Sequence, residues 1–123
     1  KPLARILGWS EAGVEPLVMG ESPVPAVRRL LDHHGLADAD VDLWELNEAF
    51  AAVSLANNEL LGLSTGNVNV RGGAVVLGHP IGASGARILV TLVYAMKDLG
   101  KRRGLAALCI GGGEGVALLV ERA

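Results

Sequence analysis

Two side chains that can move protons near neutral pH lie in unusually glycine-rich stretches. His79 lies within GGAVVLGHPIGASGAR, residues 72–87, and Cys109, the only cysteine, begins CIGGGEG, residues 109–115. Glycine permits sharp turns, leaves space for a substrate and exposes main-chain N–H donors. Histidine titrates near physiological pH, and a cysteine thiolate is both a base and a nucleophile. The two motifs therefore predict a site of acid–base or covalent chemistry.

The neighbours of His79 favour a functional role. Pro80 disfavours helical backbone at His79 and makes the turn rigid. The helix expected next begins with small residues, Gly82 to Gly85, so its N-terminal N–H groups remain accessible to an anion or a polarised oxygen. A structural histidine rarely needs so many glycines nearby.

Cys109 and Asn47 each leave two interpretations open. A cysteine in an apolar run is usually a buried, inert side chain, but the glycines that follow Cys109 could bring its thiol to a cavity. Asn47 stands at the start of a segment rich in Ala, Val and Leu, where it could cap a helix or supply a functional amide. Its neighbour Glu48 does not decide between them, and Phe50, the only phenylalanine, is expected in the core.

Hydrophobic periodicity and glycine stops predict the order β-α-β-α-β-α-β-β. The strands are expected at 3–14, 41–46, 67–70, 105–110 and 116–121, and the helices at 23–34 (capped by Ser22), 47–61 and 82–99. Alternating units favour a layered α/β fold, here a five-stranded mixed sheet with helices on both faces and an antiparallel closing pair. Loops that leave the C-terminal ends of the strands gather at one edge of the sheet, where ligands usually bind. Asn47, His79 and Cys109 are all expected at that edge.

Composition excludes several other classes of protein. The chain has 123 residues, a single-domain length, with a net charge of −2 and only 3% aromatic residues, so it offers no stacking platform for nucleic acid. The cluster at 101–103 is the densest run of basic residues and is expected to be a solvated turn. Neither a Walker A motif nor GxGxxG spacing is present. His33 and His34 have no third ligand at a useful spacing, so we expect a surface pair and no metal site.

Cysteine usage and hydropathy indicate the cellular context. A single cysteine cannot form an internal disulfide, and the sequence contains no Asn-x-Ser/Thr acceptor and no apolar run of about 18 residues. We therefore expect a cytoplasmic protein, or one of an organelle matrix in a eukaryote. The chain begins at Lys1, directly in a strand-like segment without a signal peptide, so we expect it to be part of a longer protein.

Taken together, three motifs resemble the thiolase family. They are NEAF at 47–50, the His79 motif and the Cys109 motif, in the family's order and at its spacing. The resemblance is to the family's C-terminal domain and covers residues 1–123. NEAF, in place of the histidine-containing version of the sterol-carrier-type branch, is similar to the acetyl-CoA acetyltransferase and 3-ketoacyl-CoA thiolase group. In that family two similar α/β halves pack together, and this chain resembles the second.

The resemblance implies a role for four residues. His79 would activate the acyl-accepting cysteine and help to hold the thioester oxygen, and Asn47 would fix a water that completes this first oxyanion hole. Cys109 would be the acid/base at the α-carbon, and the backbone N–H of Gly111 would contribute to a second oxyanion hole. Coenzyme A would be a substrate carrier, and no cofactor is expected.

The chain departs from the family at two flanking positions and lacks one part of the site. Arg71 stands where many relatives have Asn, and Glu114 where Gln or Met is common, which affects the expected substrate preference more than the reaction class. The acyl-accepting cysteine and most coenzyme A contacts belong to the family's first half. The resemblance therefore implies an N-terminal thiolase domain as partner, a homo-oligomeric full-length protein and an inactive isolated fragment.

Two other hypotheses follow from the same residues. Cys109 could itself be the nucleophile, paired with His79 in a free-standing cysteine acyltransferase or hydrolase. Alternatively, the chain could be a non-catalytic binding or dimerisation module that retains a thiolase-like fold.

Overall fold

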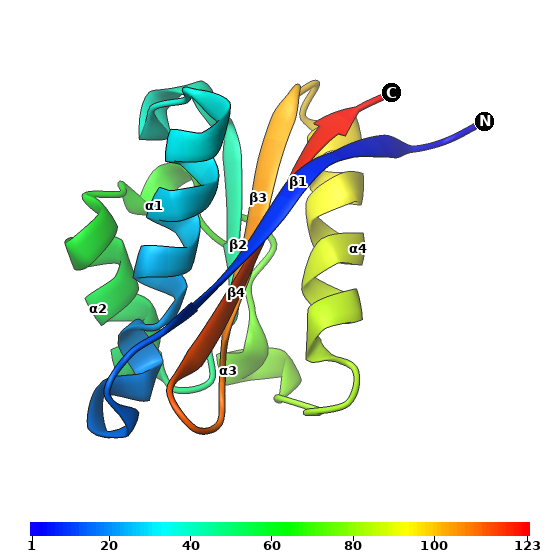
Figure 1. Cartoon of the computed structure of the whole chain (residues 1–123). Helices are drawn as coiled ribbons and strands as arrows, with labels where there is room; N and C mark the ends of the chain where they lie inside the picture. Colours follow the sequence, from blue (N-terminus) through cyan, green and yellow to red (C-terminus); the bar gives the residue numbers. More distant parts are fainter.

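The computed structural model describes residues 1–123 and places four strands in one mixed sheet (Figure 1). The strands are β1 (Ala4–Gly13), β2 (Leu43–Leu46), β3 (Arg103–Ile110) and β4 (Glu114–Arg122), in the order β1-β4-β3-β2. β4 runs antiparallel to both β1 and β3, whereas β2 runs parallel to β3. The expected mixed sheet and its antiparallel closing pair are confirmed.

Helices cover both faces of this sheet, as expected (Figure 1). α1 (Pro23–His34) and α2 (Ala51–Leu61) lie on one side, α4 (Ser84–Asp98) lies on the other, and α3 (Ala74–Leu77) is a single turn. Three short 3₁₀ segments complete the chain: η1 (Pro16–Glu21), η2 (Asp38–Asp40) and η3 (Thr65–Asn67).

The alternation of side chains along β3 divides the core into two layers. Leu105 and Ala107 pack toward α1, in a cluster that includes Trp44 and Leu119. Ala106, between them in sequence, packs instead in the cluster formed with α4. The apolar stripe of α1 faces the first layer, and the helix ends at a glycine in the left-handed conformation, as its sequence predicts.

The prediction of a fifth strand at 67–70 is wrong. Only one bridge, between Trp44 and Val68, pairs this segment with β2. Asn69 has a φ of 48°, a left-handed backbone that cannot continue a strand. Its side chain replaces the lost pairing, because Oδ1 accepts from the N–H of Leu46 and Nδ2 donates to the carbonyl of Leu46, each at 2.9 Å. The left-handed turn at Asn69 therefore ends the segment that its β-propensity had predicted to be a strand.

Other local expectations are also corrected. α2 begins at Ala51, so Asn47 does not open a helix and is not its N-cap. Phe50 occupies the cap position and is 70% exposed, outside the core. Ser22 occupies the N-cap position of α1 as expected, but its side chain makes no capping bond, because the buried hydroxyl lies 2.6 Å from the carbonyl oxygen of Glu114 and ties α1 to the start of β4.

Candidate active site

His79, Cys109 and Gly111 line one cavity of about 700 Å³. The remaining lining residues are mostly apolar and include Phe50, Ile81, Gly85, Leu108 and Val116. Asn47 directly follows β2, is 3% exposed, and contacts the ring of His79 without itself lining the cavity. The structure therefore brings together all four residues singled out from the sequence, at the sheet edge where they were expected. His79 follows the short helix α3, not a third strand.

The amide of Asn47 lies beside the ring of His79 without a short bond to it. Its Nδ2 atom is 3.5 Å from both Nδ1 and Nε2, the outer limit of a hydrogen bond. The main chain of Asn47 is held more firmly, since its N–H donates to Ala107 at 2.9 Å and extends the pairing of β2 with β3. The amide N–H groups thus remain able to hold a water or a ligand oxygen.

Ser84 makes the one short hydrogen bond to the ring of His79. Its Oγ lies 2.6 Å from Nδ1 and also donates to the carbonyl of Pro80 at 3.1 Å. In the tautomer with a hydrogen on Nδ1, the ring donates to Oγ while the hydroxyl donates to Pro80, so both contacts are hydrogen bonds. In the neutral ring, Nε2 then has the free lone pair that a general base needs. In the sequence, Ser84 stands out only as one of the small residues that begin the helix, and this contact was not predicted.

Glu48 holds the segment that leads to His79. Its Oε2 accepts from the N–H of Val75, at the start of α3, at 2.9 Å, and its Oε1 accepts from Asn69 at 3.3 Å. A Cβ at Gly73 would meet this carboxylate, which would have to shift to admit a side chain there. Glu48 thus positions the loop of His79 from the neighbouring strand. Its sequence position directly after Asn47 was the only signal for this role.

The thiol of Cys109 lies 7% exposed at the end of β3. Burial raises the pKa of this thiol above its usual value of 9.0. The ring of His79 makes its short hydrogen bond with Ser84 and a 3.5 Å contact with Asn47, and no hydrogen bond joins it to Cys109. The backbone N–H of Cys109 itself favours the thiolate, but the effect of burial is larger, so the pKa is raised on balance.

The glycines of the two motifs serve different purposes. Gly113 has a φ of 96° in the turn between β3 and β4, and a Cβ at Gly115 would collide with the carbonyl of Ser22. These two are required by the fold. Gly82, Gly85 and Gly111 have ordinary φ angles, and an added Cβ would meet nothing within 4 Å. Packing within the chain therefore does not explain these three, which leave free space at or near the cavity.

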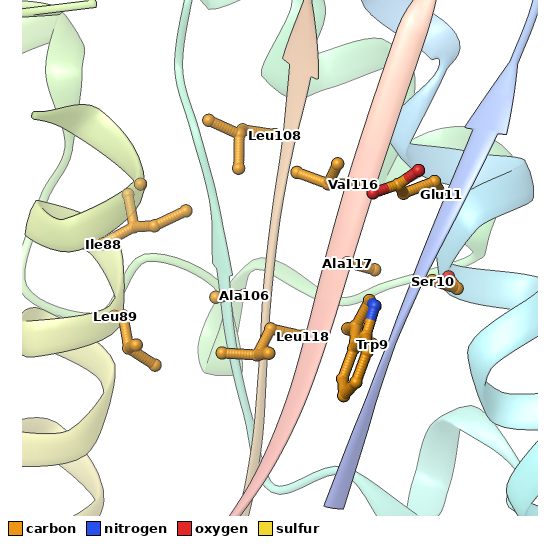
Figure 2. Close-up of a pocket in the computed structure, with 11 residues that line it drawn as sticks. Trp9, Ser10, Glu11, Ile88, Leu89, Ala106, Leu108, Val116, Ala117 and Leu118 are labelled. Carbon is orange, nitrogen blue, oxygen red and sulfur yellow. The ribbon is translucent and has the colours of Figure 1, made fainter. Parts of the chain in front are cut away.

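An uncovered apolar groove adjoins the cavity (Figure 2). Its labelled side chains extend from α4 across β3 and β4 to β1, where Trp9 is 72% exposed. The groove, of about 220 Å³, shares Gly85, Leu108 and Val116 with the cavity. A protein surface laid on the groove would therefore also form part of the cavity wall.

Fold and site together define an α/β domain in which His79 and Cys109 share a cavity next to an apolar groove. The residues of the cavity can move protons and donate hydrogen bonds to an oxygen. The groove leaves the opposite side open to a second protein surface.

Comparison with known proteins agrees with this class. The family model of the thiolase C-terminal domain matches residues 1–122, and the chain belongs to the thiolase family as this domain. It is 59% identical to the cytosolic acetyl-CoA acetyltransferase of Mus musculus over 122 residues, and 58% identical to the acetyl-CoA acetyltransferase of Escherichia coli over 121. These alignments cover 99% and 98% of the chain but 31% of each relative, so the chain spans about a third of their length.

Solved structures give the same result. The acetyl-CoA acetyltransferase of Bacillus anthracis superposes on the whole chain with a TM-score of 0.98 at 51% identity, over 31% of its own length. The Acat5 thiolase of Ascaris suum, solved in complex with coenzyme A, gives a TM-score of 0.94 at 50% identity, over 32% of its length. Separately, none of the helices combines the length and apolar composition needed to cross a bilayer.

Proposed function

We propose that this chain supplies one side of the active site of a thiolase that cleaves 3-ketoacyl-CoA with coenzyme A, or condenses acetyl-CoA in the reverse direction. The observation that carries the proposal is the shared wall between the cavity of His79 and Cys109 and the uncovered groove. A half-site open toward a missing surface fits a domain that spans about a third of its relatives. These relatives are acetyl-CoA acetyltransferases, which supports the substrate class.

His79 and Asn47 form the first part of the proposed machinery. With Nδ1 bonded to Ser84, Nε2 of His79 takes the proton of an acyl-accepting cysteine supplied by the rest of the protein. The protonated Nε2–H then faces the thioester oxygen as a donor, together with a water held by the amide of Asn47. Fixed donors of this kind stabilise the negative charge that develops on oxygen.

Cys109 and Gly111 form the second part. The sulfur of Cys109 removes a proton from the α-carbon in condensation and returns it in cleavage, as general base and then general acid. Its raised pKa suits the acid role in this isolated domain, and the base role requires a cationic or dipolar neighbour from the rest of the site. The open backbone N–H of Gly111 donates to the second thioester oxygen.

The rest of the protein completes the proposal. An N-terminal thiolase domain lies on the groove, carries the acyl-accepting cysteine and provides most coenzyme A contacts. We further propose a homo-oligomeric, cytoplasmic protein without a resident cofactor, in which coenzyme A serves only as the substrate carrier. The cytosolic mouse and rat relatives support the compartment.

Acyl labelling tests this assignment against the nucleophilic role of Cys109. The full-length protein is incubated with radiolabelled acetyl-CoA, and the modified cysteine is located by mass spectrometry. We expect the acetyl group on a cysteine outside residues 1–123, and loss of labelling when that cysteine is replaced by alanine. A stable acetyl group on Cys109 would instead establish the free-standing cysteine mechanism, which needs a thiolate that burial in this chain disfavours.

Activity of the fragment provides a second measurement. We expect the purified 123-residue chain to give no thiolysis of acetoacetyl-CoA, because the acyl acceptor is absent from it. Turnover by the fragment at a rate comparable to the full-length protein would overturn the half-site proposal. A full-length protein that is inert and unlabelled would support the binding-module hypothesis.

A further inference from the structure

One face of the first turn of α4 touches both polar side chains of the first oxyanion hole. Ser84 and Arg87 are three residues apart and therefore lie on the same face of the helix. Ser84 bonds to the ring of His79, as described above. Arg87 reaches the other side chain, since its Nη2 lies 3.5 Å from Oδ1 of Asn47.

Glu45 holds the guanidinium of Arg87 from the opposite side. Glu45 and Asn47 are two residues apart at the end of β2, so their side chains leave the same face of the sheet. Nη1 of Arg87 lies 3.6 Å from Oε2 of Glu45. Glu45 is 2% exposed, and neither of its carboxylate oxygens has a hydrogen-bond partner.

A buried ion pair of this kind carries a large desolvation penalty. Removing both charges from water costs several kcal/mol per ion, and apolar residues of similar size often give equal or better stability. Stability alone therefore does not explain Glu45 and Arg87 beneath the site. Their position next to Asn47 indicates a role in orienting that side chain.

We propose that Arg87, held by Glu45, is a positioning residue that fixes the orientation of the Asn47 amide. A guanidinium has donors and no acceptor, so only the amide oxygen of Asn47 can face it. The NH₂ group is then directed toward His79 and is available to the water of the first oxyanion hole. This inference rests on the proposed function, which gives Asn47 its task.

A double-mutant cycle in the full-length protein tests whether Arg87 acts through Asn47. Arg87→Met keeps the apolar stem and removes the donors, and we expect kcat for acetoacetyl-CoA thiolysis to fall about 10- to 100-fold with little change in KM. In an Asn47→Ala background the same substitution should cause no further fall, because the group that it orients is gone. Equal falls in both backgrounds, or no fall in the wild type, would overturn the inference.

Two further variants separate orientation from folding. Arg87→Met leaves a buried carboxyl group without its partner, so the double variant Glu45→Gln/Arg87→Met removes both charges. We expect it to recover the thermal midpoint of the wild type but not its kcat; recovery of kcat would show that the pair is only structural. Arg5→Met, which breaks an exposed pair with Glu121, is the matched control and should retain wild-type activity.

The outcomes distinguish this inference from the function on which it rests. A wild-type protein that lacks thiolase activity contradicts the proposed function itself. An active wild type whose Arg87→Met variant is equally active contradicts the positioning role alone.

Discussion

The hydroxyl of Ser84 determines which nitrogen of His79 is free. When its proton is donated to the carbonyl of Pro80, Nδ1 is the donor to Oγ and Nε2 is the base. The same carbonyl also accepts the backbone N–H groups of Ala83 and Ser84, so it stays satisfied without the hydroxyl. The hydroxyl is thus needed by the ring more than by the fold.

Replacing this hydroxyl should affect the rate more than substrate binding. In the full-length protein, we expect Ser84→Ala to lower kcat about 10- to 100-fold with KM nearly unchanged, because the ring loses its fixed tautomer and orientation. Ser84→Thr, which keeps a hydroxyl, should recover much of the rate. Ser64→Ala, at an exposed cap position without a side-chain hydrogen bond, is the control. A wild-type rate for Ser84→Ala would show that this hydroxyl does not position the ring of His79.

Glu45 should make stability depend on pH near neutrality. Burial raises its pKa from 4.5 to about 7, against the opposing attraction of Arg87. An acid with a raised pKa in the folded state stabilises the fold below its unfolded pKa, and this contribution is lost as the pH rises through about 7. A shift of this size corresponds to about 3 kcal/mol. Asp42 and Glu121 have lowered pKa values, so their contributions change only below their ordinary values of 3.8 and 4.5.

Denaturant unfolding of the chain at about pH 5.5 and about pH 8 measures this dependence. We expect the free energy of unfolding to fall between the two pH values in the wild type, and to fall less in Glu45→Gln, which has no group to titrate. The histidines are identical in both proteins and cancel in the comparison. Equal falls in both proteins would show that Glu45 is not responsible.

At the scale of the elements, two kinds of glycine lie in and beside the turn between β3 and β4: those that the fold requires and those that leave space in the cavity. Gly115→Ala should lower the free energy of unfolding by about 1–3 kcal/mol, because its Cβ collides with the backbone of Ser22. Gly13→Ala, on the paired strand β1, meets nothing and should leave stability unchanged. Denaturant midpoints of the two variants test this contrast, and a stable Gly115→Ala would contradict it.

Gly111→Ala should instead separate activity from stability. Its Cβ meets nothing in the chain but enters the cavity, so we expect an unchanged unfolding midpoint together with reduced thiolysis by the full-length protein. A loss of stability without the loss of activity would assign Gly111 to the fold.

Much of this architecture could be predicted from residue patterns. The strands at both ends of the chain, α1 with its glycine stop, and the meeting of Asn47, His79 and Cys109 follow from periodicity and topology. The contacts of Ser84, Glu48 and Arg87 could not be predicted, because each depends on a tertiary approach between segments. Asn69 shows the same limit: nothing in its local sequence indicates a left-handed residue that ends a strand.

At the scale of the whole molecule, apolar side chains in the groove and beside it form a large exposed surface. Besides Trp9, a strip beside α4 and β1 exposes Leu3, Ile6 and Val90, which line a further cavity of about 520 Å³ that meets the groove at Leu89. Exposed apolar patches of this extent mark interaction surfaces. Under the proposed function, the N-terminal domain would bury this strip and close the active site in the same packing event.

A charge at Trp9 should therefore have opposite effects in two forms of the protein. In the full-length protein, we expect Trp9→Glu to lower the thermal midpoint and the activity together, because a carboxylate is placed in an apolar interface. In the isolated chain it should reduce aggregation, measured by light scattering, since the position is solvent-exposed there. Trp9→Phe keeps the apolar surface and is the matched control. A full-length Trp9→Glu protein that behaves like the wild type would show that this face is not an interface.

The amide of Asn69 has a further consequence for the sheet. β2 is an edge strand, and an open edge invites the strands of other molecules to add to it. At Leu46 both outward main-chain groups are already occupied by this one side chain, so an incoming strand would find neither a donor nor an acceptor there. The residue that ended the expected fifth strand also protects the end of the sheet nearest the active site against intermolecular β-pairing.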